Sequence, residues 1–353
     1  MLSYRLETFG APLVARHGET PAPEGREVVV AVGSCGVCHS DVHLADGYFD
    51  LGDGNRIGLA ASVAPPRTLG HEIAGRVVAI GPDVTGVAVG DRRVVYPWIG
   101  CGRCAMCRAG DEHLCGQSRA IGVNVDGGFA DHVLVPDAKY LFEYAPLSEE
   151  QACTYACSGL TAFSALKKVA SCFAGTGKDG QLLIIGAGGV GLSGIRMAKQ
   201  LGLPAPIVAE VDPSKWDIAR AAGAADVIDP KADGASRALI KATAGGVAAA
   251  IDFVGAGETF AFGFGALRKG ATLVSVGLFG GATSISPAMI ALKAARIVGS
   301  YVGSPAEMSE LMAMARSAAL PELPLSSVPL SAASATLEAL KAGQVRGRAI
   351  LKP

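Results

Sequence analysis

The chain has 353 residues, which is enough for one large domain or two domains of ordinary size. Its 31 basic and 32 acidic residues nearly cancel, so the composition offers no charge excess for nucleic acid or an anionic membrane. The most apolar stretches are short and interrupted by glycine, and the first ten residues lack the pattern of a signal peptide. We therefore expect a soluble, cytoplasmic protein that binds neither nucleic acid nor a membrane.

The first 150 residues have the pattern of β-structure. Runs rich in β-branched residues are separated by Gly, Asp and Pro, and they lie at residues 27–37, 71–81, 91–97 and 129–136. Between the first two runs, residues 48–69 are polar and rich in glycine. This stretch predicts a long loop that acts as a lid or a specificity element.

From about residue 155, apolar strands alternate with helical patterns. The candidate strands lie at residues 182–186, 206–210, 226–229, 248–255, 271–277 and 296–302. This alternation predicts a parallel sheet covered on both faces. One helix start is clearly marked, because Asp212 can cap it, Pro213 suits the first turn and Gly223 can close it. Near the end we expect a proline-punctuated loop at 320–330 and a returning strand in residues 343–353.

The sequence "GAGGVG" follows an apolar strand and opens a helix. It matches G-x-G-x-x-G through Gly186, Gly188 and Gly191, with Gly189 and Val190 between them. Such a turn lets the backbone and the helix N-terminus approach a pyrophosphate. Glu210 lies 24 residues after Gly186, where an acid would hold a ribose hydroxyl and repel a 2′-phosphate, so we predict NAD. The alternatives are a turn without a ligand, and Asp212 in place of Glu210.

Four cysteines lie within fifteen residues of one another. They are spaced C-x2-C-x2-C-x7-C, as Cys101, Cys104, Cys107 and Cys115. Four thiolates suit tetrahedral zinc and leave no open position, which is typical of a structural site. An iron–sulfur cluster and a redox dithiol are the alternatives for these residue types.

A second metal-ligand set is scattered along the chain. Cys38, His71 and Cys157 offer two sulfurs and one imidazole, which would leave a fourth zinc position open as in catalytic sites. Sequence distance does not show that these three residues meet. Cys153, four residues before Cys157, is the alternative third ligand.

Together these motifs, in this order, resemble the zinc-dependent medium-chain alcohol dehydrogenases over essentially the whole chain. The resemblance implies an α/β protein with two domains: a GroES-like, β-barrel-type catalytic domain of residues 1–155 and 297–353, and a Rossmann doubly wound parallel-sheet NAD-binding domain of residues 156–296. It implies an active site in the cleft between them, with one catalytic and one structural Zn²⁺ per chain. The implied reaction is reversible hydride transfer between a primary or secondary alcohol and NAD. Relatives are dimers or tetramers, so we expect a homo-oligomer, with the tetramer favoured.

The resemblance also implies roles for single residues. Ser40 and His43 would relay the proton, Asp41 would orient the zinc-bound histidine, and Glu72 would lie beside the metal. The implied cofactor contacts are Thr161 to the nicotinamide, Lys215 to the ribose, and His39 and Arg348 to the pyrophosphate. Asp41 as a turn cap, His39 as a free surface residue and Lys215 as a solvated residue are the simpler alternatives.

Tyr48, Phe49 and Trp98 are placed to line an apolar substrate pocket, although each could instead belong to the core. They favour an alcohol, aldehyde or ketone that is apolar, aromatic ones included. A polyol dehydrogenase is the alternative within the class, and Cys157 speaks against it. A non-catalytic protein that binds zinc and a dinucleotide is the alternative outside it.

Overall fold

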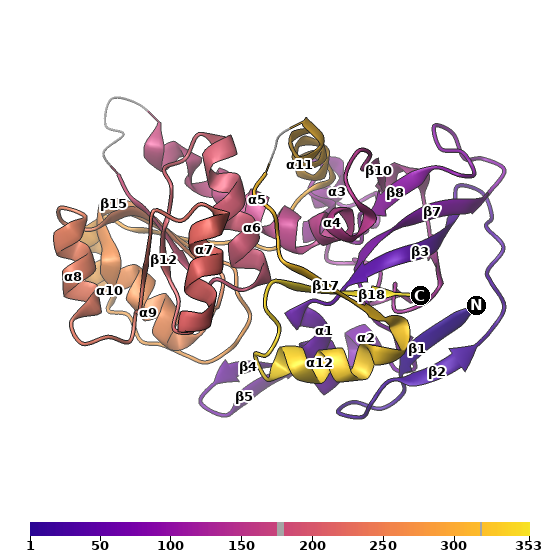
Figure 1. The fold of residues 1–353 in the computed structure, drawn as a ribbon, viewed down its shortest axis with the longest axis horizontal. Helices are drawn as coiled ribbons and strands as arrows, with labels where there is room; N and C mark the ends of the chain where they lie inside the picture. The colour runs from indigo at the N-terminus through magenta and orange to yellow at the C-terminus, as the bar shows by residue number, and fades with distance from the viewer. Residues whose placement is uncertain (175–179, 318–319) are drawn as a thin grey trace.

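Two sheets of different construction dominate the computed structural model, which describes residues 1–174, 180–317 and 320–353. Figure 1 shows them as two lobes, one made of both ends of the chain and the other of its middle. The α/β fold predicted from the sequence is confirmed. The domain boundaries remain a prediction; the strand that spans the expected boundary at 297 pairs within the parallel sheet.

The lobe that holds both chain ends is built on a mixed sheet. Its strands run in the order β10-β8-β7-β3-β18-β17, and β9 also pairs with β3. Their bounds are β3 Val28–Gly36, β7 Glu72–Ile80, β8 Arg92–Val95, β9 His132–Val135, β10 Leu141–Glu143, β17 Leu325–Pro329 and β18 Arg348–Lys352. The expected returning strand is β18, which pairs with β3 and so completes the first lobe with the last residues of the chain.

The expectation of a loop at 320–330 is wrong in part, because β17 forms there. β17 pairs in parallel with β18 and lies at the end of the strand order. A proline is tolerated at such an edge, since it lacks only the N–H that an outer neighbour would use. Pro329 is therefore compatible with a strand that the prolines alone argue against.

The middle lobe is a six-stranded parallel sheet in the order β13-β12-β11-β14-β15-β16. Its strands are β11 Leu182–Ile185, β12 Ile207–Ala209, β13 Asp226–Ile228, β14 Val247–Asp252, β15 Leu267–Ser275 and β16 Arg296–Gly299. Every residue of β11 and β14 is buried, as expected for strands covered on both faces. All six predicted strands are confirmed.

The two faces of this parallel sheet belong to different cores. Leu182 and Ile184 join the core that continues into the first lobe, whereas Leu183 and Ile185 join a separate core. Successive strand residues point to opposite faces, so this division follows from the strand itself. One continuous core therefore connects the two lobes.

Helices cover the sheets and connect the lobes. Those before the parallel sheet are α1 His39–Asp46, α2 Ala60–Val63, α3 Ala105–Arg108, α4 Glu149–Cys153 and α5 Ser158–Val169. The others are α6 Gly189–Ala198, α7 Trp216–Ala222, α8 Ala235–Ala242, α9 Gly257–Ala266, α10 Pro287–Lys293, α11 Pro305–Ser317 and α12 Ala333–Lys341. The Asp212 carboxylate accepts from the Ser214 amide, and Gly223 closes α7 with φ of 114°, so the predicted helix signals are confirmed.

Residues 48–69 contain ordered elements where a loop is expected. β4 Tyr48–Gly52 and β5 Asn55–Gly58 form an antiparallel hairpin, and α2 and the short β6 Arg67–Thr68 follow it. The hairpin extends from the first lobe toward the parallel-sheet lobe (Figure 1). A Cβ atom added at Gly52 would lie 2.3 Å from the backbone nitrogen of Ala282, so the two lobes touch here through backbone. The remaining strands, β1 Leu2–Leu6 and β2 Val14–His17, form a small sheet with β6.

Candidate active site and metal centres

Cys38, His71 and Cys157 meet at the junction of the two lobes. Cys38 follows β3 and precedes α1, His71 directly precedes β7, and Cys157 precedes α5. All three are buried, and their ligand atoms lie within 4.8 Å of one another. The His71 Nε2 atom is buried and has no hydrogen-bond partner among the described residues. An unpartnered buried nitrogen beside two thiols fits a metal ion with one imidazole and two sulfur ligands.

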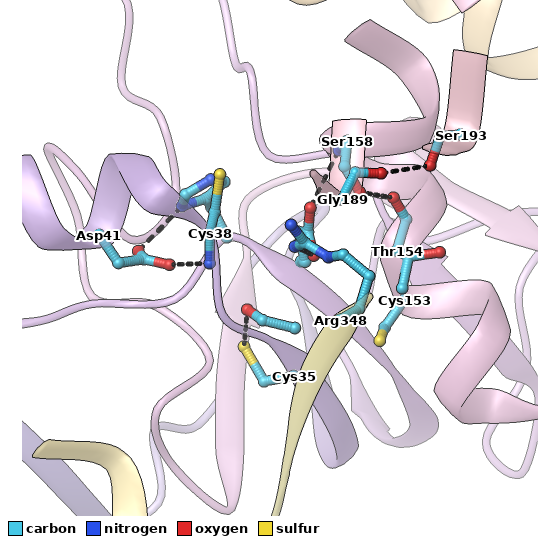
Figure 2. Close-up of polar contacts among 12 residues, drawn as sticks. Cys35, Cys38, Asp41, Cys153, Thr154, Ser158, Gly189, Ser193 and Arg348 are labelled. Carbon is cyan, nitrogen blue, oxygen red and sulfur yellow. Dashed lines mark hydrogen bonds and ion pairs between the residues drawn. The ribbon is translucent and has the colours of Figure 1, made fainter. Parts of the chain in front are cut away.

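Asp41 orients the histidine of this cluster. Its carboxylate lies 3.1 Å from His71 Nδ1, and it also accepts a hydrogen bond from the Cys38 backbone N–H at 2.9 Å. Figure 2 shows the Asp41 carboxylate between these two contacts. A proton on Nδ1 donated to the carboxylate leaves the lone pair of Nε2 free for a metal. Asp41 is thus both a helix cap, as the simpler alternative proposed, and the group that orients the ligand.

The pKa values of the Cys38 and Cys157 thiols are shifted in opposite directions. A hydrogen bond from Cys157 lowers the pKa of Cys38 well below its usual value, and the same contact raises the pKa of Cys157. Burial opposes protonation of His71, but Asp41 and Cys38 outweigh it and raise the pKa of His71. Two adjacent buried thiols ionise together only when a cation neutralises them, so the donor set itself calls for a metal.

The other two cysteines near this cluster point elsewhere. The Cys153 thiol lies 3.3 Å from the Glu150 carbonyl, to which it donates, and the Cys35 thiol contacts the Gly36 carbonyl. Figure 2 shows Arg348 between Cys153 and Cys38. Cys153 therefore does not join the ligand cluster, whose third member is Cys157.

Cys101, Cys104, Cys107 and Cys115 form the second cluster with metal-ligand spacing. Backbone N–H groups point at their sulfurs, from Cys101 to Cys115 at 3.3 Å and from Cys107 to Cys104 at 3.5 Å. Glu112 lies between Cys107 and Cys115 in the sequence. Its carboxylate accepts hydrogen bonds from Lys139 at 2.8 Å and from Tyr140, which attach the four-cysteine segment to the rest of the protein. Four converging sulfurs leave no open position, so this cluster fits a structural zinc site.

Behind the first cluster, Glu72 pairs with Arg348. Glu72 is fully buried, accepts from the Ser158 backbone N–H at 2.9 Å and forms an ion pair with the Arg348 guanidinium. Arg348 also lies against Gly189, the first residue of α6, because a Cβ added there would be 2.4 Å from its Cδ. Arg348 thus lies between the Glu72 carboxylate and the glycine-rich turn, at which the family resemblance implies a contact with the pyrophosphate.

The glycine-rich turn joins β11 to α6. Gly186 has φ of 92°, and a Cβ at Gly191 would lie 1.9 Å from the Gly186 carbonyl oxygen, so both positions require glycine. A Cβ at Gly188 would meet nothing within 4 Å, which leaves its surroundings open for a ligand. The Glu210 carboxylate, at the end of β12, accepts from the Ala187 N–H at 2.7 Å. The turn and its acid are thus in the predicted places.

The other residues predicted to contact the cofactor lie on α1, α5 and α6 and in the turn after β12. Lys215 lies 3.7 Å from Asp212 in an ion pair, Val190 is half-buried at the start of α6, and Thr161 is buried on α5. The His39 ring on α1 lies 5.8 Å from Phe279, which lies between β15 and β16 along the chain and is 61% exposed. Phe279 was missed by the sequence analysis.

The residues predicted for the proton relay lie on α1. Ser40 and His43 are half-buried and three residues apart, which places them on one face of the helix. The His43 Nε2 atom is buried without a hydrogen-bond partner in the described parts of the chain. Its ring lies 5.2 Å from His39 and 5.1 Å from Phe49.

The three aromatic residues predicted for the substrate pocket have different surroundings. Trp98 is buried, its ring lies 5.4 Å from His71, and its indole N–H donates to the Ala156 carbonyl. Phe49 contacts His43, whereas Tyr48 packs under Arg56 of the same hairpin at 4.0 Å. Trp98 is therefore next to a metal ligand, whereas the Tyr48 ring is covered by Arg56 of its own hairpin.

Comparisons with known proteins agree with this geometry. Residues 24–146 match the family "Alcohol dehydrogenase GroES-like domain", and residues 189–317 match "Zinc-binding dehydrogenase". The chain is 35% identical over 356 residues to the NAD-dependent alcohol dehydrogenase of Sulfurisphaera tokodaii, covering 100% of both proteins. The chain belongs to the zinc-containing alcohol dehydrogenase family. The predicted family and enzyme class, an oxidoreductase with two zinc sites, are confirmed.

Two further relatives show the range of the family. The crystal structure of the alcohol dehydrogenase from Aeropyrum pernix has a TM-score of 0.89 and 30% sequence identity, covering 100% of both chains. The L-threonine 3-dehydrogenase of Pyrococcus horikoshii is 32% identical over 301 residues, covering 82% of this chain and 79% of that protein.

Among the helices of the described residues, none combines the length and the apolar character that a membrane span requires.

Proposed function

We propose that this alcohol dehydrogenase transfers hydride reversibly between an apolar primary or secondary alcohol and NAD, at the Cys38, His71 and Cys157 cluster. The observation that carries this proposal is the buried, unpartnered Nε2 of His71 beside two thiols. Arg348, which pairs with Glu72 next to His71, packs against Gly189 of the glycine-rich turn. When bound, zinc would polarise the oxygen of the alcohol or carbonyl, and the nicotinamide would accept or return the hydride.

The chain's own residues hold these groups and move the proton. Asp41 holds His71 in the tautomer that presents Nε2, and Glu72 fixes Arg348 beside the glycine-rich turn. Ser40 Oγ is assigned to receive the proton of the alcohol, and the unpartnered Nε2 of His43 is assigned to take it on. Burial of the metal ligands excludes water from the reacting centre.

We assign protein contacts to the cofactor from its adenosine end to its nicotinamide end. Glu210 and Lys215 would hold the adenosine ribose, and the turn from Gly186 to Gly191 would hold the pyrophosphate with His39 and Arg348. Thr161 would contact the nicotinamide. Support comes from the burial of Glu210 at the end of β12, and from relatives named as NAD-dependent.

The role of His43 predicts a pH profile. Burial lowers the pKa of His43, and the nearby His39 lowers it further, so the imidazole stays neutral below its usual pKa of about 6.5. A base must be neutral to accept a proton, so kcat/KM for alcohol oxidation falls only as the pH drops through this lowered value. We expect His43→Gln to lose this acidic limb and to lower kcat by up to about 10²-fold. A pH profile of kcat/KM that is identical in the variant and the parent would remove His43 from the relay.

The edge of the parallel sheet supports the expected homo-oligomer. β16 is the last strand in the order, and in the described residues it pairs only with β15. Ile297 on this strand and Leu292 on α10 are 41% and 66% exposed. An exposed apolar edge strand pairs readily with another strand, so we propose that two copies join through β16, as a dimer or as half of a tetramer. Ile297→Lys should halve the mass measured by sedimentation; an unchanged mass would place the interface elsewhere.

A reducing compartment such as the cytoplasm is part of this proposal. All nine cysteines are free thiols, and seven of them lie in the two ligand clusters. Thiols must stay reduced to hold zinc.

Absorbance of NADH at 340 nm tests the proposed function. The panel contains ethanol, 2-propanol, benzyl alcohol, a polyol and the matching carbonyl compounds, each assayed with NAD and NADP, before and after a zinc chelator. The proposal predicts NAD-linked turnover of the apolar alcohols that the chelator abolishes. A preference for the polyol would favour the polyol dehydrogenase, and no turnover of any member would favour a non-catalytic binding protein.

A further inference from the structure

The segment that follows the last strand of the parallel sheet is held in an unusual way. β16 ends at Gly299, and among residues 300–304 only Tyr301 is exposed, at 51%, whereas Ser300, Val302 and Ser304 are 8% exposed or less. In an open parallel sheet, ligands bind beyond the carboxyl ends of the strands. Tyr301 therefore projects from a buried segment at the edge of the sheet where a ligand is expected.

The backbone around Tyr301 is fixed at several points. The Ser300 N–H donates to the Ser275 carbonyl at 2.9 Å, the Gly303 carbonyl accepts from the Tyr96 hydroxyl at 2.8 Å, and the Ser304 N–H donates to Glu307 at 2.9 Å. Between these anchors, Val302 has φ of 38°. A β-branched residue pays a steric cost in this left-handed region, and such strain is retained mainly at functional sites. The segment is therefore held in a costly conformation that keeps Tyr301 outside the core.

Tyr301 faces the metal-ligand cluster through Trp98. The rings of Tyr301 and Trp98 lie 5.8 Å apart in an edge-on arrangement, and Trp98 lies 5.4 Å from the His71 ring. The indole N–H already donates to the Ala156 carbonyl, so the buried Trp98 ring meets the Tyr301 ring with apolar atoms.

We propose that Tyr301 is a specificity-determining residue of this enzyme, whose ring, edge-on to Trp98, forms the wall that selects alcohols and ketones carrying an aryl group next to the reacting carbon. The inference rests on the proposed function, and it adds a residue that the sequence motifs do not contain. A flat aryl group would pack against the exposed face of Tyr301, whereas a short alkyl group leaves that face in water. The ring, and not the hydroxyl, supplies the selectivity, because the hydroxyl has no hydrogen-bond partner among the described residues.

The test compares Tyr301→Ala and Tyr301→Phe with the parent, using benzyl alcohol and ethanol. The measured quantity is the ratio of kcat/KM for the two alcohols with saturating NAD. We expect Tyr301→Ala to lower this ratio by about 10- to 100-fold, and Tyr301→Phe to keep it close to the parent value. Unchanged NADH affinity and melting temperature in both variants will show that the fold and the cofactor site are intact.

Three results would overturn the inference. The first is an unchanged ratio in Tyr301→Ala. The second is an equal fall of kcat/KM for both alcohols, as for a merely structural residue. The third is a loss of selectivity in Tyr301→Phe as large as in Tyr301→Ala, which would assign the effect to the hydroxyl. Failure of the proposed function is distinct from all three, because the parent enzyme would then oxidise neither alcohol.

Discussion

We expect Cys157→Ser to abolish turnover and to leave the protein folded. The variant should lower kcat by about 10³-fold or more, because a serine hydroxyl is a poor zinc ligand and the metal supplies several kcal/mol of charge stabilisation in the transition state. Zinc measured by atomic absorption should fall from two ions per chain to one. NADH binding, followed by fluorescence, should be largely retained, since the glycine-rich turn and Glu210 are held by their own contacts.

The matched control is Cys153→Ser, four residues earlier on the chain. Cys153 is also fully buried, but its thiol donates to the Glu150 carbonyl and lies outside the ligand cluster. A serine hydroxyl can make the same hydrogen bond, so this variant should keep both zinc ions and most of the activity. The reverse outcome, with loss in Cys153→Ser and activity in Cys157→Ser, would assign the third ligand to Cys153.

We expect Glu210→Ala to weaken NAD binding and to relax the discrimination against NADP. The buried carboxylate accepts from the backbone N–H groups of Ala187 and Asp212, so it also shapes the glycine-rich turn. Hydrogen bonds to a charged group contribute about 1.5–3 kcal/mol, so the KM for NAD should rise about 10- to 100-fold. The KM for NADP should fall, because the variant lacks the charge that repels a 2′-phosphate.

Asp212→Ala is the control for this second prediction. Asp212 lies two residues from Glu210 and accepts from the Ser214 N–H as a helix cap. Its loss should lower the free energy of unfolding by about 1 kcal/mol without changing the preference between NAD and NADP. A parent enzyme that already prefers NADP, or a change of preference in Asp212→Ala alone, would contradict the role given to Glu210.

The parallel sheet and its glycine-rich turn were predictable because their signals are local. The buried strands have continuous apolar residues, Gly186 and Gly191 meet steric demands within one turn, and the cap at Asp212 acts over two residues. The order of the predicted strands along the chain needed no information about distant contacts.

The metal-ligand cluster was predicted from residue types and from the family resemblance. Cys38 and Cys157 are 119 positions apart in the sequence, and nothing in the spacing places their sulfurs together. Convergence depends on the pairing of β3 with β7 and β18, which brings Cys38, His71 and Arg348 to one place. The sequence motifs named the ligands, and the tertiary pairing of strands brings them together.

The hairpin, β17 and Tyr301 show what sequence patterns miss. β4 and β5 are mostly exposed and contain glycines, so they lack the alternation that identifies a strand, and their tip is packed against Ala282 in the other lobe. Pro329 argued against a strand because its edge position was unknown. Tyr301 belongs to no motif; it lies inside the sixth predicted strand, residues 296–302, whose last residues extend beyond the end of β16 at Gly299.

The most direct test of the central claim is a crystal structure of the fully metallated protein, with anomalous scattering measured at the zinc edge. We expect two zinc ions per chain: one among the four cysteines between 101 and 115, and one bound by Cys38 Sγ, His71 Nε2 and Cys157 Sγ. Bond lengths should be about 2.3 Å to sulfur and 2.0–2.1 Å to nitrogen. A single anomalous peak per chain, located among Cys101, Cys104, Cys107 and Cys115, would contradict the proposed active site.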